Sequence, residues 1–395
     1  MRVLFSTLTA YGHFFQVLPL AVAARRAGHE VVFATGEVRH KLLRELGLEV
    51  AAAGRETEEL VAEAARSVGV PPPSEQQAPD RQAMELISKE FCRLAPKSYV
   101  DDLLPEFERA RPDLVVHASY NPGAGLAAKA AGIPALCHAS GRIRPAQDYL
   151  MVMSEDVLRE YASRELGLEL PATYTTYLDH PYLDICPASL QDQDFVAACG
   201  ERRFEMRPVG FNPPGEIPAW VRDRSRAKPL VYLTLGTESD NRVLAMMREA
   251  VAGLSTLDVD VLVATPKLAT ELGELPPNVR VEPWVAQAEL LAHVDLVVQH
   301  GGNGTTFGAL GSGIPQLFLQ NLPGPDQLLN AGMVCDAGAG ELLKHEDITA
   351  DTVATAARDL LGDAARTAAA KEIARQVDAM PTPDEIARRL PDLAT

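Results

Sequence analysis

The sequence has few of the features that mark nucleic-acid-binding, disulfide-stabilised or membrane proteins. Its 37 lysines and arginines face 54 aspartates and glutamates, and the net charge of −17 opposes binding to phosphate backbones or anionic lipid. Five cysteines, odd in number and without CxxC spacing, indicate neither a disulfide framework nor a zinc site. No apolar run reaches the roughly 18 residues of a membrane helix. We therefore expect a cytoplasmic protein with no nucleic-acid or membrane partner.

The order of apolar segments predicts two doubly wound α/β domains. At the amino end we expect a strand at 2–7, a helix at 18–28 with Pro19 in its first turn, and a strand at 29–35. Continuous apolar strands of this kind are typical of a parallel sheet covered on both faces. A second strand at 229–237 follows a proline-rich, charged stretch, which we interpret as a linker. Residues 51–110 and 140–205 fit the pattern poorly, and 173–184 has the composition of an aromatic-rich loop.

Two segments, 113–138 and 295–319, resemble each other in pattern. Each contains an apolar strand, a glycine-rich turn, a short helix, Gly-Ile-Pro and a second strand. Two such domains facing each other would place the carboxyl ends of their strands along one interdomain cleft, where this class of sheet binds ligands. We expect domains at 1–207 and 229–375, a linker at 208–228, and a final helix within 376–395 that packs back on the first domain.

The motif "HGGNGTT", residues 300–306, lies where a strand passes into a helix. Free backbone N–H groups and the positive end of the helix favour an anion there, and glycines allow it to approach closely. Thr305 and Thr306 add hydroxyl donors, and His300 adds a ring nitrogen. No lysine follows the glycines and the spacing is not GxGxxG, so neither a Walker A loop nor a dinucleotide fingerprint is present. The motif predicts a phosphate or diphosphate site, with a tight packing turn as the alternative.

Residues 284–331, "WVAQAELLAHVDLVVQHGGNGTTFGALGSGIPQLFLQNLPGPDQLLNA", resemble the donor-binding signature of nucleotide-sugar glycosyltransferases with the GT-B fold. The resemblance is greatest to actinomycete enzymes that decorate antibiotics of the enediyne (calicheamicin-type) and macrolide groups, and it extends from the amino terminus through the final helices. It implies an acceptor-binding domain at 1–207 and a donor-binding domain at 229–375.

The resemblance also implies roles for residues of the second domain. Trp284 would stack on the nucleobase, and His300, Gly302, Gly304 and Thr305 would hold the diphosphate. Asp326 and Gln327 would hydrogen-bond the sugar hydroxyls, which suits a carboxylate and an amide. The donor-binding set that follows from it is Thr237, Trp284, Val285, His300, Gly302, Asn303, Gly304, Thr305, Asp326 and Gln327. The alternatives are a solvated loop for the Asp-Gln pair and ordinary burial for the tryptophan.

Gly308 departs from the plant members of the family. Those carry at this position a glutamate that grips both ribose hydroxyls. A 2′-deoxyribose offers no second hydroxyl, so a carboxylate would be left unpaired there at a cost in free energy. The glycine therefore favours a dTDP-sugar over a UDP-sugar as donor.

His13, which we place in the loop after the first strand, is the candidate general base. Its imidazole suits removal of the acceptor proton as the oxygen attacks the anomeric carbon opposite the diphosphate, which inverts that carbon. The alternative is a histidine that only caps the loop or helix. The family often supplies an orienting carboxylate where this sequence has Ala118. The orienting group here is Ser119, an acid from the loop expected at 69–100, or none.

The sequence predicts no metal site and no cofactor beyond the nucleotide-sugar substrate. The motif "DVD" at Asp258–Asp260 matches the DxD metal motif of another glycosyltransferase fold. It precedes the strand "VLVAT" and so belongs at the amino edge, away from the ligand edge. The charge that develops on the leaving group would then be stabilised by the helix end, backbone amides and His300.

Aromatic residues of the first domain are candidates for an apolar acceptor pocket, with burial in the core as an equal alternative. The aromatic candidates are Phe14, Phe15, Tyr174, Tyr177 and Tyr182, and Ser119 is added to the acceptor-binding set. Together these observations predict an inverting, metal-independent transferase that moves a hexose or deoxyhexose from a dTDP-sugar to a hydrophobic natural-product aglycone; the sequence is also compatible with a homodimer. A nucleotide-sugar 2-epimerase would need cleft carboxylates in place of His13, and a non-catalytic partner would lack His13, His300 or Asp326–Gln327.

Overall fold

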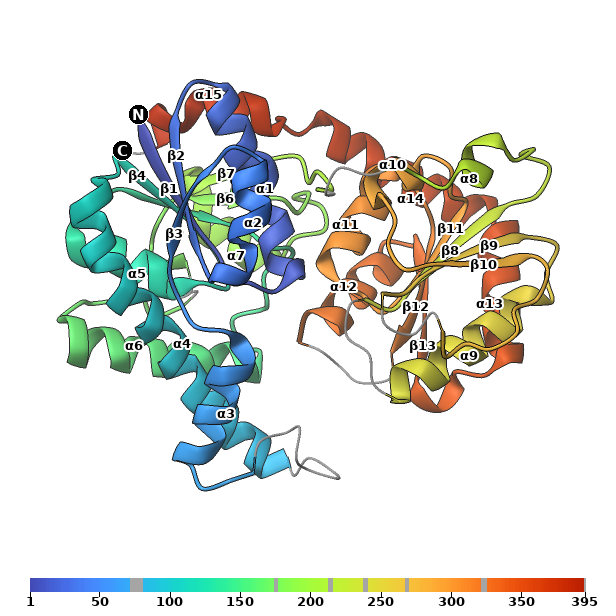
Figure 1. Ribbon diagram of the computed structural model, residues 1–395, viewed down its shortest axis with the longest axis horizontal. Coiled ribbons are helices and arrows are strands. Elements are labelled where there is room, and N and C mark those ends of the chain that lie inside the picture. The colour runs from blue at the N-terminus through green and yellow to red at the C-terminus, as the bar shows by residue number, and fades with distance from the viewer. Residues whose placement is uncertain are drawn as a thin grey trace. The chain divides into compact units, whose positions relative to one another are not determined.

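The chain divides into two compact units, each described here by itself. The computed structural model describes residues 1–71, 81–173, 177–211, 216–236, 241–266, 270–320 and 325–393 (Figure 1). Unit 1 comprises Met1–Met206 and Pro381–Thr395, and unit 2 comprises Arg207–Met380. Two of the predicted site residues, Tyr174 and Thr237, lie outside the described residues.

Unit 1 contains a parallel sheet, seven-stranded within the described residues, of order β3-β2-β1-β4-β5-β6-β7. Its strands are β1 (Arg2–Ser6), β2 (Glu30–Thr35), β3 (Glu49–Ala52), β4 (Leu114–Ala118), β5 (Ala135–His138), β6 (Tyr182–Asp184) and β7 (Arg203–Glu205). Its helices are α1 (Tyr11–Arg26), α2 (His40–Glu45), α3 (Thr57–Ser67), α4 (Arg81–Ala110), α5 (Pro122–Ala131), α6 (Tyr149–Leu166), α7 (Gln193–Cys199) and α15 (Pro383–Leu393), with 3-10 turns η1 (Glu37–Arg39) and η4 (Gly200–Arg202).

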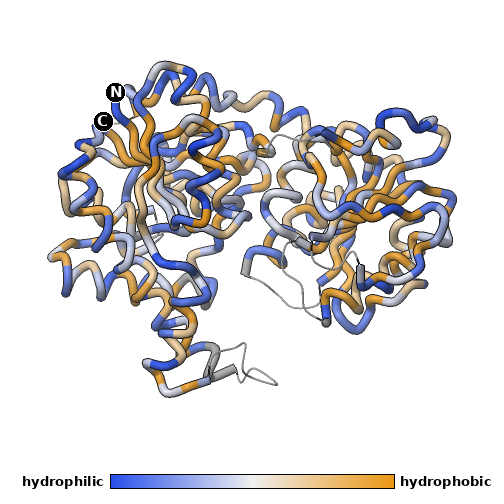
Figure 2. Tube along the Cα trace, in the orientation of Figure 1, coloured by the Kyte–Doolittle hydropathy of each residue, from blue (hydrophilic) through white to orange (hydrophobic). Residues whose placement is uncertain are grey.

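Helices cover both faces of this sheet, as its continuously apolar strands require. Residues of α4, α5 and α6, among them Leu103, Leu126 and Leu158, form one core cluster with Leu4 and Val115 of the strands. Against the other face, Phe14 of α1 meets Phe33 of β2 edge-on, and Phe33 stacks on Phe5 of β1. Figure 2 shows the strands as largely hydrophobic segments. The predicted doubly wound class is confirmed for this unit.

The last helix, α15, packs on α1 in unit 1. Ile386, Leu390 and Leu393, spaced four and three residues apart, form its buried stripe. Arg26 at the end of α1 donates two hydrogen bonds to the carboxylate of Asp384, at 2.8 and 2.9 Å. A segment distant in sequence thereby completes unit 1.

Unit 2 contains a parallel sheet, six-stranded within the described residues, of order β10-β9-β8-β11-β12-β13. Its strands are β8 (Leu230–Thr234), β9 (Asp260–Ala264), β10 (Val279–Glu282), β11 (Leu296–Gln299), β12 (Gln316–Gln320) and β13 (Gly340–Lys344). Its helices are α8 (Ala219–Asp223), α9 (Asn241–Ser255), α10 (Gln287–Leu291), α11 (Asn303–Ser312), α12 (Pro325–Asp336), α13 (Ala350–Gly362) and α14 (Ala364–Ala379), with the 3-10 turn η5 (His345–Asp347).

Two core clusters bury the faces of the second sheet. One contains Leu254 of α9 and Leu360 of α13 against the strands, and the other contains Leu291 of α10 and Ala309 of α11. Residues Ile217 and Val221 belong to the second cluster. Residues 216–228, which the sequence assigns to a linker, therefore pack into unit 2.

Three local expectations were wrong. The first helix begins at Tyr11, not near residue 18, so Pro19 lies inside it. Burial of Phe14, Val17 and Leu18 on its core-facing side outweighs the hydrogen bond that the proline removes. Within 173–184, β6 forms because Tyr182 and Leu183 are buried. Within 69–100, the described residues from Arg81 onward form a long helix, α4, in place of a loop.

Among the described residues, no helix is long and apolar enough to cross a membrane.

Candidate active site

The motif at 300–306 follows β11 at the carboxyl edge of the sheet of unit 2 and opens α11. β11 lies in the sheet between β8 and β12. Gly302 is the N-cap and supplies no capping side chain, and the first turn has no acidic residue. The first N–H groups of a helix have no acceptor within the helix itself. The sequence has thus placed an uncapped helix end, with its positive dipole, at the ligand edge of the sheet.

Glycines allow the backbone and the His300 ring to pack closely at this edge. Gly301 has φ +98°, and a β-carbon on it would lie 2.5 Å from the carbonyl oxygen of Gln327. A β-carbon on Gly302 would lie 2.8 Å from Nε2 of His300, and one on Gly236, after β8, would lie 3.0 Å from it. Real β-carbons do not approach this closely, so these glycines are needed for the arrangement.

Buried amide side chains hold the loop. Gln299 donates to the Thr306 hydroxyl at 3.2 Å and to the Gln316 side chain at 2.5 Å, and its own oxygen accepts from the N–H of Gly301. Gln320 donates to the carbonyl of His300. Such groups are costly to bury unless they are hydrogen-bonded, so this network fixes the loop conformation.

Asn330 of α12, which is 1% exposed, links the loop to the next helix. Its amide donates to the Gly301 carbonyl at 2.8 Å and to Oδ1 of Asn303 at 2.7 Å. Asn303 in turn places its Nδ2 3.5 Å from the Asp326 carboxylate. The predicted diphosphate loop and the Asp326–Gln327 pair are therefore parts of one assembly.

Sequence reasoning missed these amides because they are far apart along the chain. The available signal was the presence of Gln299, Gln316 and Gln320 in otherwise apolar, buried strands, since buried glutamines need partners. Sequence reasoning also predicted that the Thr306 hydroxyl would be a free hydrogen-bond donor. Thr306 is fully buried and its hydroxyl accepts from Gln299, so it supports the loop instead.

His300 is a neutral imidazole at neutral pH. Desolvation by burial lowers its pKa to about 4, although an interaction with the backbone of Thr234 partly opposes this effect. A neutral ring donates one N–H hydrogen bond and carries no charge. In the unliganded protein, the His300 ring can therefore offer an anion one N–H hydrogen bond but no positive charge.

The remaining predicted donor residues lie on the segment after β10 and on α11. Trp284 is 44% exposed, so the alternative of ordinary burial does not describe it. Val285 is buried in the core of unit 2. The Thr305 hydroxyl lies 3.5 Å from Oε1 of Gln287, and half-buried Gly304 and Gly308 lie one turn apart on α11.

In unit 1, His13 lies in the first turn of α1, the helix that follows the carboxyl end of β1, and not in a loop as expected. Its ring contacts the ring of Tyr120, with centroids 4.6 Å apart and planes inclined at 45°. Tyr120 follows β4, and the next residue, Asn121, is buried and donates from Nδ2 to the Ser6 hydroxyl at the end of β1. Adjacent strands thus fix the two rings against each other.

Other predicted residues of unit 1 have mainly packing contacts. Phe14 and Tyr177 are buried, and Tyr177 packs edge-on against Tyr182 and Phe195. The core alternative therefore describes these side chains. Half-buried Phe15 lies 5.0 Å from the ring of Tyr11. Other residues are found where β4 ends: Ala118 is buried, and Ser119 lies 3.5 Å from the hydroxyl of Ser140.

The acidic pair of "DVD" is engaged by basic side chains. Asp260 begins β9, at the amino edge as the sequence predicts, and Asp258 just precedes it. Lys228 contacts Asp258 at 2.6 Å and Arg224 contacts Asp260 at 3.4 Å. In the described part of the chain, no group of three or more histidine, cysteine or acidic residues is arranged to hold a metal ion.

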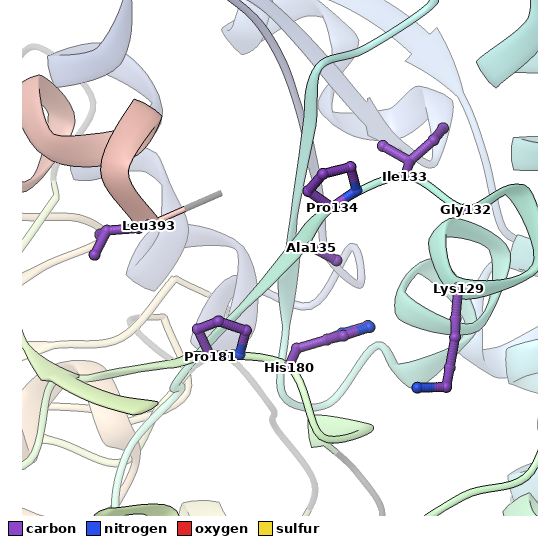
Figure 3. A pocket seen from close by; sticks show the side chains of 8 residues that line it. All are labelled: Lys129, Gly132, Ile133, Pro134, Ala135, His180, Pro181 and Leu393. Carbon is purple, nitrogen blue, oxygen red and sulfur yellow. The ribbon is translucent and has the colours of Figure 1, made fainter. Parts of the chain in front are cut away.

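A pocket of about 350 Å³ lies at the other edge of the sheet of unit 1, where β5 and β6 begin (Figure 3). Lys129, His180 and Pro181 contribute to its wall, and Nδ1 of His180 lies 3.0 Å from Nε2 of buried His117. Because ligands of doubly wound sheets bind at the carboxyl edge, this pocket is distant from the predicted site within the unit.

Comparison with known families matches nearly the whole chain. Residues 22–236 match the amino-terminal domain, and residues 248–393 the carboxyl-terminal domain, of the erythromycin biosynthesis protein CIII-like family. The chain belongs to this family. The CIII-like family and its relatives identify the chain as a glycosyltransferase of the antibiotic-biosynthesis type, as the sequence predicts.

Alignments with individual relatives extend over nearly the full length of this CIII-like chain. It is 31% identical over 415 residues to elloramycin glycosyltransferase ElmGT of Streptomyces olivaceus, covering 99% of this chain and 97% of the relative. It is 29% identical over 398 residues to L-demethylnoviosyl transferase of Streptomyces niveus, with the same coverages. The structure of spinosyn rhamnosyltransferase SpnG with spinosyn aglycone matches with a TM-score of 0.79 and 26% identity, covering 99% of this chain and 100% of that one. The GT-B fold is thereby confirmed.

Proposed function

We propose that the protein transfers a deoxysugar from a dTDP-linked donor to a hydroxyl or similar nucleophile of a hydrophobic natural product. Transfer inverts the anomeric carbon and requires no metal ion or further cofactor. The observation that carries the proposal is the assembly at 299–306, in which an uncapped helix end follows His300, and Asn330 and Asn303 link this loop by hydrogen bonds to Asp326. SpnG supports it, since its structures include complexes with thymidine diphosphate and with spinosyn aglycone.

Unit 2 binds the donor in this proposal. The diphosphate takes hydrogen bonds from the first N–H groups of α11, the Thr305 hydroxyl and the neutral His300 ring. Trp284, exposed after β10, offers its indole face to the nucleobase. Asp326 and Gln327 receive the sugar hydroxyls, and Thr237 completes the donor-binding set.

Gly308 supports thymidine over uridine as the nucleoside. A β-carbon there would lie 3.0 Å from Cδ1 of Leu291 and 3.8 Å from Nε2 of Gln287. As a glycine, residue 308 has no carboxylate that could bind a pair of ribose hydroxyls. A 2′-deoxyribose leaves no polar group unpaired beside this glycine.

Unit 1 binds the acceptor and supplies the base. His13 removes the proton of the acceptor hydroxyl while the oxygen attacks the anomeric carbon. The bond between that carbon and the diphosphate oxygen breaks, and the leaving group retains the electron pair. Attack opposite the leaving group inverts the carbon. The charge that develops on the diphosphate is stabilised by the fixed dipoles around α11.

Isothermal titration of dTDP and UDP, without added metal, into the wild-type protein and His300→Ala tests the donor site. We expect dTDP to bind more tightly than UDP and to lose ~10- to 100-fold in affinity in the variant, because one hydrogen bond to a charged group is removed. His345→Ala, which alters an exposed histidine of unit 2, is the control and should bind as the wild type does.

Three outcomes would contradict the proposal. If well-folded wild-type protein binds neither nucleotide, residues 300–306 are a packing turn and not a diphosphate site. Equal affinity of wild type and His300→Ala would remove His300 from the donor site. Binding that appears only after Mg²⁺ is added would contradict the metal-independent mechanism.

A further inference from the structure

Arg142 lies in unit 1 on the segment that follows β5, at the carboxyl edge of the sheet. Residues just before it are held by neighbouring strand ends: the N–H of Ala139 donates to Leu183 of β6 at 2.8 Å, and the N–H of Ser140 donates to the Ser119 hydroxyl at 3.3 Å. The charge of Arg142 acts on Cys186, just after β6. Arg142 thus lies over the ends of β5 and β6, on the edge that carries His13 and Tyr120.

A buried polar network fixes the backbone next to Arg142. The N–H of Ile143 donates to Oε1 of Gln191 at 3.0 Å. The amide of Gln191 donates to both carboxylate oxygens of Asp184, at 3.1 and 3.0 Å, and Arg203 donates to the same carboxylate at 2.8 Å. Asp184 is fully buried. This network neutralises the charge of Arg203 and holds the segment in one conformation.

Arg142 itself has no partner among the residues that the structure describes. In the described part of the chain it makes no hydrogen bond and no ion pair, although its Nε is buried and its side chain is half-buried. Its neighbour Arg144 donates to Asp148 at 3.0 Å, and the more buried Arg203 is paired with Asp184. The sequence has 54 acidic residues against 37 basic ones, so the missing partner does not reflect a shortage of carboxylates.

An unpaired guanidinium in this position costs free energy. Arginine stays protonated in proteins, and burying part of its charge without an opposite charge or hydrogen bonds is unfavourable. The planar fork of its N–H groups matches carboxylate and similar anionic oxygens, which form the strongest hydrogen bonds with it. An anionic ligand at the carboxyl edge would offset this cost.

We propose that Arg142 binds a carboxylate of the acceptor and so selects acidic aglycones. This inference rests on the proposed function, because it takes unit 1 as the acceptor-binding unit. Arg142 orients the acceptor and takes no part in the proton transfer. The buried Asp184–Gln191–Arg203 network serves to position it.

Two hydroxyanthraquinones provide a matched pair of probes: rhein carries a carboxylate where aloe-emodin carries a hydroxymethyl group. Fluorescence titration of each into the wild type should show a preference for rhein of ~10- to 100-fold, the worth of a charge-assisted hydrogen bond. Arg142→Gln should abolish this preference, and Arg142→Lys should restore part of it. Arg144→Gln, which removes a neighbouring but paired arginine, should keep the wild-type preference.

Thermal unfolding and dTDP titration of the same variants complete the experiment. Arg142→Gln should be at least as stable as the wild type, since it removes an unpaired charge, and should bind dTDP unchanged. Loss of stability in this variant would overturn the inference. A wild-type protein that binds both probes equally, or binds neither, would also overturn it. Weaker dTDP binding in Arg142→Gln would assign Arg142 to the donor diphosphate and overturn the acceptor role. Failure of dTDP to bind the wild type would instead contradict the proposed function.

Discussion

The contact between His13 and Tyr120 bears on how readily the imidazole accepts a proton. An aromatic face within about 6 Å of a cation stabilises it, and the ring centroids here are 4.6 Å apart. The start of α1, where His13 lies, acts in the opposite direction because a positive helix end disfavours a cation. In the proposed mechanism, Tyr120 therefore partly offsets the helix and stabilises the imidazolium that forms as His13 takes the acceptor proton.

Replacement of Tyr120 by leucine should lower kcat/KM by ~2- to 5-fold, the worth of a cation–π contact at a partly exposed site, because the imidazolium that forms during transfer is less stabilised. The measurement is the steady-state rate of each variant. Tyr120→Phe keeps the aromatic ring and should keep the wild-type kcat/KM. His13→Ala should lose ~10²- to 10⁴-fold of the rate. An unchanged kcat/KM in Tyr120→Leu would show that the contact is only structural.

Single residues differ in how far the sequence reveals them. His300 and the Asp326–Gln327 pair stand in a local motif, so their meeting at one site could be predicted. Asn330, Tyr120 and Arg142 could not be selected in this way, because their significance depends on contacts with strands and loops elsewhere in the chain. Only the fold brings Asn330 of α12 to the carbonyl of Gly301.

The turn between β11 and α11 depends on a backbone conformation that only glycine adopts easily. Gly301→Ala would strain φ +98° and press a methyl group against the backbone of Gln327. We expect a loss of ~1 to 3 kcal/mol in the free energy of unfolding and a loss of dTDP affinity of at least about tenfold. Urea unfolding and calorimetric titration measure the two effects.

Gly332→Ala on α12 is the matched control for Gly301→Ala. A β-carbon at Gly332 meets nothing within 4 Å, and alanine favours a helix over glycine by ~1 kcal/mol. This variant should be slightly more stable and bind dTDP normally. A Gly301→Ala protein that also keeps full stability and affinity would show that the turn relaxes without harm to the site.

Regular elements were easier to predict than their ends. The similar segments at 113–138 and 295–319 do form β4–α5–β5 and β11–α11–β12, and both helices end at a left-handed glycine, Gly132 or Gly313. The start of α1 was misplaced because Gly12 and Pro19 are locally unfavourable to a helix. Burial of its apolar side, which no local pattern measures, decided the outcome.

The two units should respond differently to acid. In unit 1, burial lowers the pKa of His117 and His138 to about 4 and that of His180 to about 2, the last also through the charges of His117 and Lys129. In unit 2, among the described residues, His300 has such a shift. A folded pKa below the unfolded value of about 6.5 means that stability is present above pH 6.5 and is lost as the pH falls towards 4.

Between pH 7 and pH 5 each fully buried histidine should remove on the order of 1 to 2 kcal/mol of stability, so unit 1 should unfold at higher pH than unit 2. Both tryptophans, Trp220 and Trp284, belong to unit 2. Far-UV circular dichroism should therefore begin to change at higher pH than tryptophan emission. His138→Leu should move the first transition to lower pH. Coincident transitions would show that the protein unfolds as one cooperative body.

The return of α15 to unit 1 has a consequence for synthesis on the ribosome. Unit 2 is one continuous stretch, Arg207–Met380, whereas unit 1 needs Pro383–Leu393 to complete its packing on α1. Nascent domains fold as their residues emerge from the amino end. Unit 2 can thus close while the earlier-made unit still lacks a helix. Translation of unit 1 begins first, but unit 1 is completed last. Until α15 has been made, the apolar surface that it will cover needs shielding from neighbouring chains.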